Sequence, residues 1–334
     1  MNPKISIIIP VYNAAATIIK CIESIQNQNL SELEIICIDD GSNDNSLELL
    51  KELTNSDSRI ITLVNSKRLG PGKTRNIGLV HAKGEAIRFI DADDQLPSNC
   101  LKFQYNYLRT HNLQAVKGAY IRTTRENEQV SVKLLNKGFI VNKSNASDQQ
   151  IELLLYDHWC YMYDHKFLQS EKLSYPEFTN AQDSVFVQNC ISRMRRFAYI
   201  PSIVYQYNFN PSSVIRKKEH PIWFENIFRE KLNLFETLSE MKREKLAVKM
   251  LYDAFKNYFD KSIFPGLVKL HKADSIKVLE YLASELTRLR IQKIMCVDNS
   301  PATVTKQDDI LELVERVSYA HHDSNFEFLF NRYV

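Results

Sequence analysis

The chain of 334 residues lacks the features that would assign it to several large classes of protein. No apolar run approaches the roughly 20 residues that a bilayer-spanning helix needs. Residues 1–10 lack the cationic start and apolar core of a signal peptide. The six cysteines show no C-x-x-C spacing, which favours buried thiols in a reducing compartment over a disulfide framework. Together these absences predict a cytoplasmic protein.

A large charge of either sign is also missing. The net charge of +3 is too small to indicate nucleic acid as a partner. One region departs from this balance, because residues 216–272 hold 13 Lys or Arg and 8 Asp or Glu, a local charge of +5. Solvated faces of amphipathic helices are the simplest interpretation of this region. Peripheral contact with the inner face of the cytoplasmic membrane is the alternative.

Two familiar kinds of site are incomplete in the sequence. The histidines show no metal-ligand spacing, and His158, beside Trp159, is interpreted as a packed or surface histidine rather than as part of a pocket. Residues 72–74 read Gly-Lys-Thr like the end of a P-loop, but the glycine required five places earlier is Lys67. The glycines here are therefore expected to shape a strand-to-helix loop, which leaves Arg75 free to meet an anion.

What the sequence does contain, over its first hundred residues, is an alternation of short apolar runs with segments of helical periodicity. The apolar runs are typical of strands buried on both faces, and they predict strands at 5–10, 33–39, 59–65 and 85–91. The segments between them predict helices from Ala14, over 44–53 and over 72–84. Because strands and helices that alternate at this spacing form βαβ units, we expect an α/β fold with a Rossmann-like, mainly parallel sheet.

Beyond residue 96 the pattern is less regular. We expect, in order, a helix, a strand, a polar hairpin-like stretch, a second helix and a second strand, over 98–110, 114–123, 124–147, 182–194 and 204–210. After Pro221 the chain is rich in Leu, Phe, Lys and Glu, which predicts a mostly helical C-terminal lobe.

Polar residues follow three of the predicted strands where each strand ends. Residues 10–13 read Pro-Val-Tyr-Asn, and residues 39–40 are both Asp. Ligands of parallel α/β sheets bind beyond the carboxyl ends of the strands, which makes this edge the predicted site. A turn with one helix-capping Asp would explain one acid of the group Asp91, Asp93 and Asp94, but three acids repel one another. We therefore interpret this group as a site for Mg²⁺ or Mn²⁺ bound with a substrate phosphate.

Asp183 lies near the start of the helix predicted from Gln182. Asn180, three residues earlier, forms an N-cap and N3 pair with it, so spacing alone favours an acid that complements the helix dipole. The alternative is a general base. A carboxylate at a helix start is held ionised, as a base must be at neutral pH, so the two roles are compatible.

These motifs in combination resemble family 2 of the inverting glycosyltransferases, whose fold is the nucleotide-diphospho-sugar transferase fold of type A. The matching segments lie in the family's order: ISIIIPVYNA (5–14), EIICIDDGSNDNS (34–46), GPGKTRNIGLVHAKGEAIRFIDADD (70–94), AQDSVF (181–186) and YQYNFNPSSV (205–214). They cover about the first 215 residues, and the rest of the chain carries no motif of the family. Where the family usually has Glu-Asp, this chain has Gln182-Asp183.

The resemblance implies a role for each candidate residue. The donor-binding set that it implies is Pro10, Val11, Tyr12, Asn13, Asp40, Arg75, Asp91 and Asp93. Within this set, Tyr12 would stack on uracil and Asp40 would accept its N3–H. Asp93, together with Asp94, would hold Mn²⁺ or Mg²⁺ on the diphosphate. Asp183 would be the catalytic base.

The resemblance implies a metal-dependent, inverting hexosyl- or N-acetylhexosaminyltransferase. Its substrates would be a UDP-sugar donor and a glycan or glycolipid acceptor, in bacterial surface polysaccharide or lipooligosaccharide synthesis. Residues 1–96 would form the donor-binding half and residues 97–215 the acceptor-binding half of one catalytic domain. Residues 216–334 would form a helical region that contacts the membrane or a second copy of the chain. A nucleotidyltransferase and a non-catalytic nucleotide-sugar-binding module are the alternatives left open.

Overall fold

The computed structural model describes residues 3–124, 128–132, 135–210, 221–254 and 278. Its contacts divide the chain into two compact units. The first comprises residues 1–177 and 182–211, and the second comprises residues 178–181 and 212–334. The sheet and all the candidate residues belong to the first unit. The divisions expected at residues 96 and 215 stay predictions.

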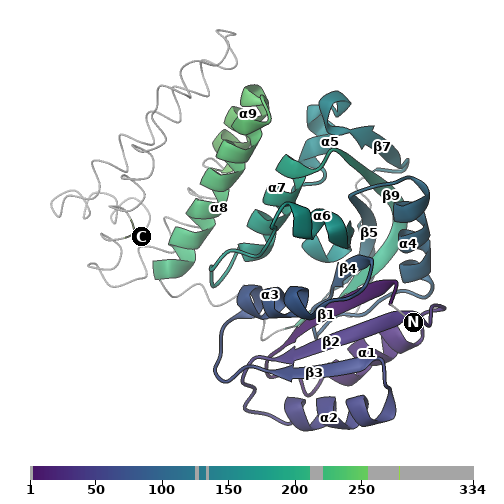
Figure 1. The fold of residues 1–334 in the computed structure, drawn as a ribbon. Coiled ribbons are helices and arrows are strands. Elements are labelled where there is room, and N and C mark those ends of the chain that lie inside the picture. Colours follow the sequence, from purple (N-terminus) through teal and green to yellow (C-terminus); the bar gives the residue numbers. More distant parts are fainter. Residues whose placement is uncertain (1–2, 125–127, 133–134, 211–220, 255–277, 279–334) are drawn as a thin grey trace, which may run out of the picture. The chain divides into compact units, whose positions relative to one another are not determined.

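The first unit is built on a nine-stranded mixed sheet with the strand order β3-β2-β1-β4-β8-β5-β9-β7, and β6 pairs with β5 outside this order (Figure 1). The neighbours β3, β2, β1 and β4 are parallel, as predicted for the first hundred residues. β8 is antiparallel to both β4 and β5. The strands are β1 (Ile5–Val11), β2 (Leu33–Asp39), β3 (Ile60–Val64), β4 (Ala86–Phe89), β5 (Ala115–Thr123), β6 (Gln129–Val132), β7 (Phe139–Asn142), β8 (Tyr161–Asp164) and β9 (Arg196–Tyr207).

The helices of the first unit follow the predicted order with shifted ends. α1 begins at Ile18, four residues after the predicted start. The hairpin expected over 124–147 is wrong, because β6 pairs with β5 whereas β7 pairs with β9. The helices are α1 (Ile18–Gln26), α2 (Ser46–Ser56), α3 (Pro71–His81), α4 (Cys100–Thr110), α5 (Asp148–Glu152), α6 (His165–Ser170), α7 (Gln182–Arg193) and the 3₁₀ turns η1 (Lys143–Asn145) and η2 (His158–Cys160).

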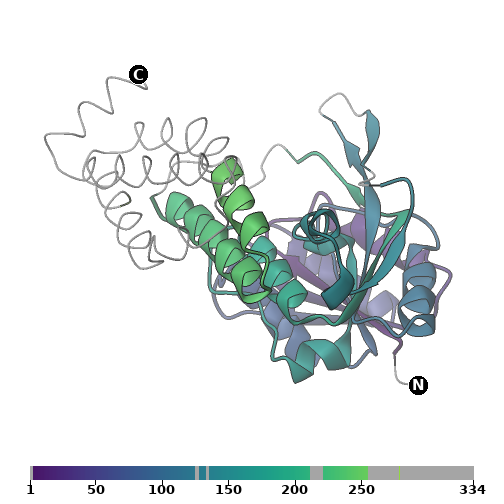
Figure 2. The same ribbon diagram turned by 90° about the horizontal axis from the view of Figure 1, so that it is seen from above.

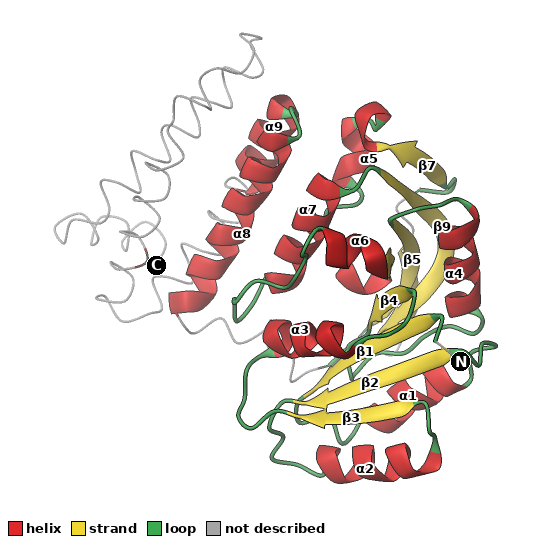
Figure 3. Cartoon of the chain, in the orientation of Figure 1, coloured by secondary structure: helices red, strands yellow, loops and turns green. Residues whose placement is uncertain are grey.

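Helices cover both faces of the sheet. Alternate residues of β1, such as Ile7 and Ile9, pack in one core with the apolar residues of α1, α2 and α4. α3 packs on the opposite face of β1 and β2, and the two layers are visible in Figure 3. On that face Phe89 of β4 meets Tyr163 of β8 and Phe186 of α7 at ring-centroid distances of 6.1 and 5.5 Å. The three-layer arrangement leaves the carboxyl ends of the parallel strands as the place where polar side chains gather.

In the second unit, α8 (Pro221–Glu240) and α9 (Glu244–Ala254) lie side by side (Figure 2). They confirm the helical prediction for these residues. The remainder of the helical region expected at 216–334, including residues 216–220 and 255–272 of its basic segment, lies outside the described residues. None of the helices in the described ranges is long and apolar enough to cross a membrane.

The turn between α3 and β4 depends on a close approach at Gly84. The Gly84 amide donates to Ser6 Oγ at 2.7 Å and to the buried Glu34 Oε1 at 3.0 Å. A Cβ on Gly84 would overlap the backbone nitrogen of Ser6 and stand 2.7 Å from the carbonyl carbon of Ile5. Because backbone atoms cannot move aside as a side chain can, the methyl group that Gly84→Ala adds has no room.

We expect Gly84→Ala to lower the free energy of unfolding by about 1–3 kcal/mol, the usual cost of overpacking. Urea unfolding measures this directly. Lys83→Ala is the matched control, because Lys83 is exposed and its interaction with Glu34 is made by the backbone amide. That variant should stay within about 0.5 kcal/mol of wild type. Equal stabilities for the two variants would contradict the packing of this turn.

Candidate functional site

The polar segments predicted to meet at one edge of the sheet do so. The ends of β1 and β2 lie side by side, with Val11 opposite Asp39 in the parallel ladder. The Asp40 amide donates to the carbonyl oxygen of Val11 at 2.7 Å. On the other side of β1, the Ile90 amide donates to the Ile8 carbonyl at 3.1 Å, which carries the chain toward the acids that follow β4.

Residues 12 and 13 join the end of β1 to the loops around it. Asn13 has a left-handed backbone with φ of 50°, and its Oδ1 accepts a hydrogen bond from the Asn43 amide at 2.8 Å. The Asn13 amide in turn donates to Ser42 Oγ at 3.0 Å. Tyr12 is partly exposed, and the guanidinium carbon of Arg68 lies 4.0 Å from its ring centroid. Arg68, which the sequence did not indicate, therefore covers one face of the proposed stacking ring.

Asp40 is buried and its carboxylate is heavily hydrogen-bonded. Oδ1 accepts from Asn65 Nδ2 and from the Leu69 amide, and Oδ2 accepts from the Gly70 amide, each at 2.8 Å. The neighbouring Asp39, also buried, uses Oδ2 to accept from backbone amides, while its Oδ1 has no hydrogen-bond partner in the described structure. Both oxygens of Asp40 are therefore already hydrogen-bonded, whereas Asp39 retains an unused buried acceptor.

Arg75 is paired rather than free, which corrects the expectation from its loop. Its guanidinium is only 4% exposed and contacts Asp91 with an Nη2–Oδ1 distance of 2.5 Å. Burial lowers the pKa of Arg75, but the acidic groups around it, with Asp91 first, together raise the pKa by more, so the net shift is upward and the group stays charged. Two other guanidinium nitrogens, Nε and Nη1, are buried without hydrogen-bond partners among the described residues. Arg75 therefore keeps unused donors beside the acid cluster.

The two acids after Asp91 take hydrogen bonds from the end of β9. Asp93 Oδ2 accepts from Asn210 Nδ2 at 2.7 Å. Asp94 is 1% exposed, and its oxygens accept from the Tyr205 hydroxyl and the Asn208 amide, both at 2.7 Å. The sequence did not predict these contacts. It indicated only that Tyr205, Asn208 and Asn210 belong to the segment 205–214, which resembles the family.

The electrostatics of this acid cluster favour a cation or a proton. Burial, followed by the charge of Asp91, raises the pKa of Asp93. The same two causes, with the charge of Asp93 added, raise the pKa of Asp94 well above its usual value. Both shifts reflect carboxylates that are desolvated beside like charges. No cluster of three or more His, Cys, Asp or Glu side chains with the arrangement of a metal site occurs among the described residues.

Asp183 lies in the first turn of α7, as predicted, and its side chain is 37% exposed. Its Oδ2 stands 3.6 Å from Nδ1 of His158, a residue of η2 that is 2% exposed. Burial raises the pKa of Asp183, but His158, ahead of Arg75 and the Ser184 amide, lowers it to about 2. The carboxylate is therefore ionised at neutral pH. Asn180, the expected capping partner, uses its amide nitrogen to donate to the carbonyl of Trp223 at 3.1 Å.

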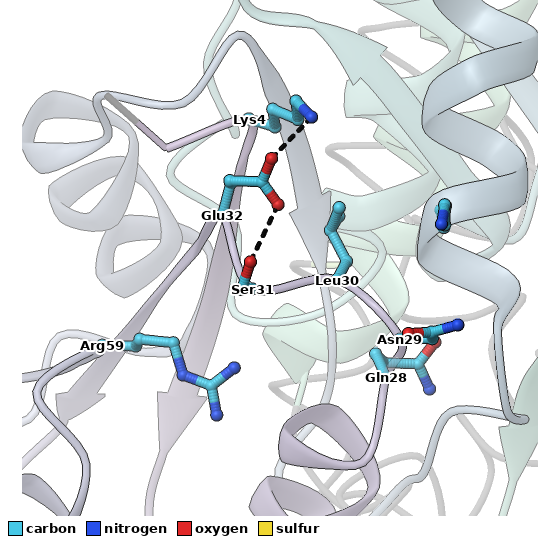
Figure 4. Close-up of a pocket in the computed structure, with 8 residues that line it drawn as sticks. Lys4, Gln28, Asn29, Leu30, Ser31, Glu32 and Arg59 are labelled. Carbon is cyan, nitrogen blue, oxygen red and sulfur yellow. Dashed lines mark hydrogen bonds and ion pairs between the residues drawn. The ribbon is translucent and has the colours of Figure 1, made fainter. Parts of the chain in front are cut away.

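A pocket of about 450 Å³ lies at the other end of the strands (Figure 4). It is lined by Lys4 before β1, residues 28–32 before β2, Arg59 before β3 and Lys102 of α4. Lys4 and Glu32 pair across it at 2.6 Å. None of the candidate residues lines this pocket, so it does not belong to the site.

Comparisons with known proteins identify relatives of the chain and its family. The family model described as "Glycosyl transferase family 2" matches residues 6–170. A protein named uncharacterized glycosyltransferase from Haemophilus influenzae is 30% identical over 81% of this chain and 99% of its own length. The poly(ribitol-phosphate) beta-glucosyltransferase of Bacillus spizizenii is 30% identical over 61% of this chain and 32% of its own. The crystal structure of Staphylococcus aureus TarS 1–349 with UDP-GlcNAc superposes with a TM-score of 0.74 at 18% identity, over 95% of this chain and 91% of that one.

Proposed function

This chain belongs to glycosyl transferase family 2, and we propose that it transfers a sugar from a UDP-sugar to a hydroxyl group of a glycan or glycolipid acceptor. The fold is the type A fold of this family, and the family's reaction is inverting. The observation that carries the donor assignment is Arg75. A buried guanidinium with two unpaired N–H-bearing nitrogens, at the edge where three strands end, is suited to an anionic diphosphate.

Uridine would be held by the ends of β1 and β2. Tyr12 offers the face of its ring that Arg68 leaves open, and Pro10, Val11 and Asn13 shape the edge around it. The uracil N3–H requires an acceptor, and a buried acid is the fitting partner. Asp40 is the predicted acceptor, but the unpaired Oδ1 of Asp39 makes Asp39 a second candidate.

The residues after β4 fit a divalent cation. Asp93 is partly buried beside Asp91, and its raised pKa reflects a carboxylate whose negative charge is not compensated. Asp93 and Asp94 would hold Mn²⁺ or Mg²⁺, hard cations that take oxygen ligands. When bound, such an ion neutralises charge on the departing UDP. Asp94 already accepts two hydrogen bonds, so Asp93 would contribute the more available oxygen.

Asp183 would act as the general base. Its ionised carboxylate takes the proton of the acceptor hydroxyl while the hydroxyl oxygen forms a bond to C1 of the sugar. The bond between C1 and the phosphate oxygen breaks, and UDP leaves with its electron pair. Attack on the face opposite UDP inverts the anomeric centre in one step, so no protein nucleophile is required. In the absence of an acceptor, water takes the place of the hydroxyl and must lose a proton in the same way.

The acceptor class is supported by the relative from B. spizizenii, whose name describes a glucosyltransferase acting on poly(ribitol-phosphate). A bacterial surface polysaccharide or lipooligosaccharide is therefore the acceptor that we propose, in a cytoplasmic setting where the enzyme contacts the membrane peripherally. A nucleotidyltransferase would use the same sheet and acids but would attack the α-phosphate and release pyrophosphate. Asp183, 3.6 Å from a buried histidine, has a use in the first reaction and none in the second.

Selectivity for uridine nucleotides tests the donor proposal. We expect UDP to displace a fluorescent UDP-sugar at concentrations at least about 10-fold lower than CDP, GDP or ADP. One well-made hydrogen bond to a base edge accounts for roughly 1–3 kcal/mol. Asp39→Asn and Asp40→Asn should each be titrated in parallel, and the variant that loses this preference identifies the acceptor of N3–H. Equal displacement by GDP or CDP in the wild-type protein would show that neither acid reads the base.

A further inference from the structure

His158 is a buried histidine that the proposed reaction leaves without a role. It is 2% exposed, and neither ring nitrogen has a hydrogen-bond partner in the described structure. Leaving a buried polar group unpaired is energetically costly, so such a residue requires an explanation. The charged group in contact with it is the Asp183 carboxylate, at 3.6 Å from Nδ1.

The surroundings of the imidazole direct it toward this carboxylate. Phe89 and Tyr175 stand edge-on around the ring, with centroid distances of 6.2 and 5.8 Å and interplanar angles of 65° and 86°. Aromatic walls exclude water and strengthen any electrostatic contact inside them. The positive charge of Arg75, which is itself paired with Asp91, also lowers the pKa of Asp183.

The turn that carries His158 is held by a buried lysine. Lys117 of β5 is 1% exposed, and its Nζ donates to the carbonyl oxygens of Leu153 and Tyr156 at 3.0 and 2.9 Å. It also contacts Asp157 Oδ2 at 3.0 Å. Asp157, directly before His158, has a left-handed backbone with φ of 62°. A non-glycine residue in this conformation persists where its surroundings fix it. The position of His158 is therefore set by β5 and by the turn before η2, both outside α7.

We propose that His158 is a positioning residue, which holds the Asp183 carboxylate through Oδ2 and leaves Oδ1 to take the proton of the acceptor. This inference rests on the proposed function, because it takes Asp183 as the base. Nδ1 carries a hydrogen in the charged imidazolium and in one neutral tautomer, so it can donate to Oδ2. The 3.6 Å separation exceeds that of a hydrogen bond. Contacts of this kind commonly shorten when the substrate binds.

The pKa of Asp183 agrees with this role. His158 lowers that pKa against the opposing effect of burial. Without His158, burial acts on the carboxyl with only Arg75 and the Ser184 amide against it, so the pKa rises. Because the reaction needs the ionised carboxylate, activity would then be lost at a higher pH as the solution is acidified.

The test is the pH dependence of UDP-glucose hydrolysis by the full chain, with water as the acceptor. His158→Phe should lower turnover at neutral pH by about 100-fold, the usual cost of a misplaced catalytic group. It should also move the acid limb of the profile upward by about 1–3 pH units. His158→Asn, whose amide nitrogen occupies the position of Nδ1, should retain most of the wild-type turnover and an acid limb near the wild-type pH. His158→Gln, which mimics Nε2 instead, should not.

His165→Phe is the matched control. His165 is another buried histidine, with Nδ1 2.7 Å from the Gly84 carbonyl oxygen, and its loss should leave the pH profile unchanged. Wild-type turnover and profile in His158→Phe would overturn the positioning role. Equal losses in His158→Phe and His158→Asn with no shift of the acid limb would overturn it too, because they describe a merely structural residue. Full turnover in Asp183→Asn would instead reject the base itself.

Discussion

Asp183→Asn is expected to lower turnover by about 10²- to 10⁴-fold, the usual contribution of general-base catalysis. Asparagine has nearly the same size and can still accept hydrogen bonds at the start of α7, but it cannot take a proton. UDP affinity should stay near wild type, because the donor contacts that we propose come from β1, β2 and the loop after β4. The lost interaction belongs to the transition state, so the change should fall on turnover rather than on binding.

Steady-state kinetics and a UDP titration on this variant separate the two roles considered for Asp183. An acid that only complements the helix dipole would be replaced by asparagine with little effect, and turnover would be near normal. Glu23→Gln removes an exposed acid of α1 and serves as the control for a general change in charge. Near-normal turnover in Asp183→Asn would move the search for the base to other acids.

Asp93→Asn is expected to weaken metal-dependent UDP binding by about 100-fold or more, since loss of even an outer partner of a metal ligand costs 10–100-fold. The fold should tolerate the change. The asparagine oxygen can still accept from Asn210 Nδ2, and one of several repelling charges is removed. A carboxyl whose pKa is raised in the folded protein stabilises it below the unfolded pKa and loses that stabilisation as pH rises through the folded value. At neutral pH the melting temperature should therefore not fall.

Calorimetric titration of UDP with and without Mn²⁺ measures this effect, and thermal melting checks the fold. Chelator should abolish the metal-dependent part of binding in the wild-type protein. Glu23→Gln again serves as the control for charge. Unchanged Mn²⁺-dependent binding in Asp93→Asn would remove Asp93 from the metal site and leave the cluster as a structural turn.

The half of the sheet that builds the donor edge could be predicted from the sequence because its pattern is local. Runs such as residues 5–10 and 33–39 are predominantly apolar without a period-2 alternation, which indicates strands covered on both faces, and polar residues gather where each run stops. The strand order farther along could not be predicted. β8 pairs with both β4 and β5 in antiparallel fashion, through residues at least 44 positions apart in the chain, which no local periodicity records.

The same limit applies to the site. The charges of Asp93 and Asp94 made them candidates from the sequence alone. Their hydrogen-bond partners, Asn208 and Asn210, lie over 110 residues away, in a segment whose sequence predicts only the end of a strand. His158 was interpreted as packed or surface, and it is packed. The role that we propose for it rests on its two unpaired ring nitrogens and on its contact with Asp183. The residues next to His158 in the sequence reveal neither feature.

Proton NMR of the first sugar released from UDP-glucose is the most direct test of the central claim. The glucose of this donor is α-linked, so single displacement at C1 with water as the acceptor gives β-glucose together with UDP, before the anomers equilibrate. Accumulation of β-glucose, dependent on Asp183 and on a divalent cation, is the expected result. Release of glucose 1-phosphate, in which the bond at C1 is intact, or of α-glucose would contradict an inverting glycosyltransferase.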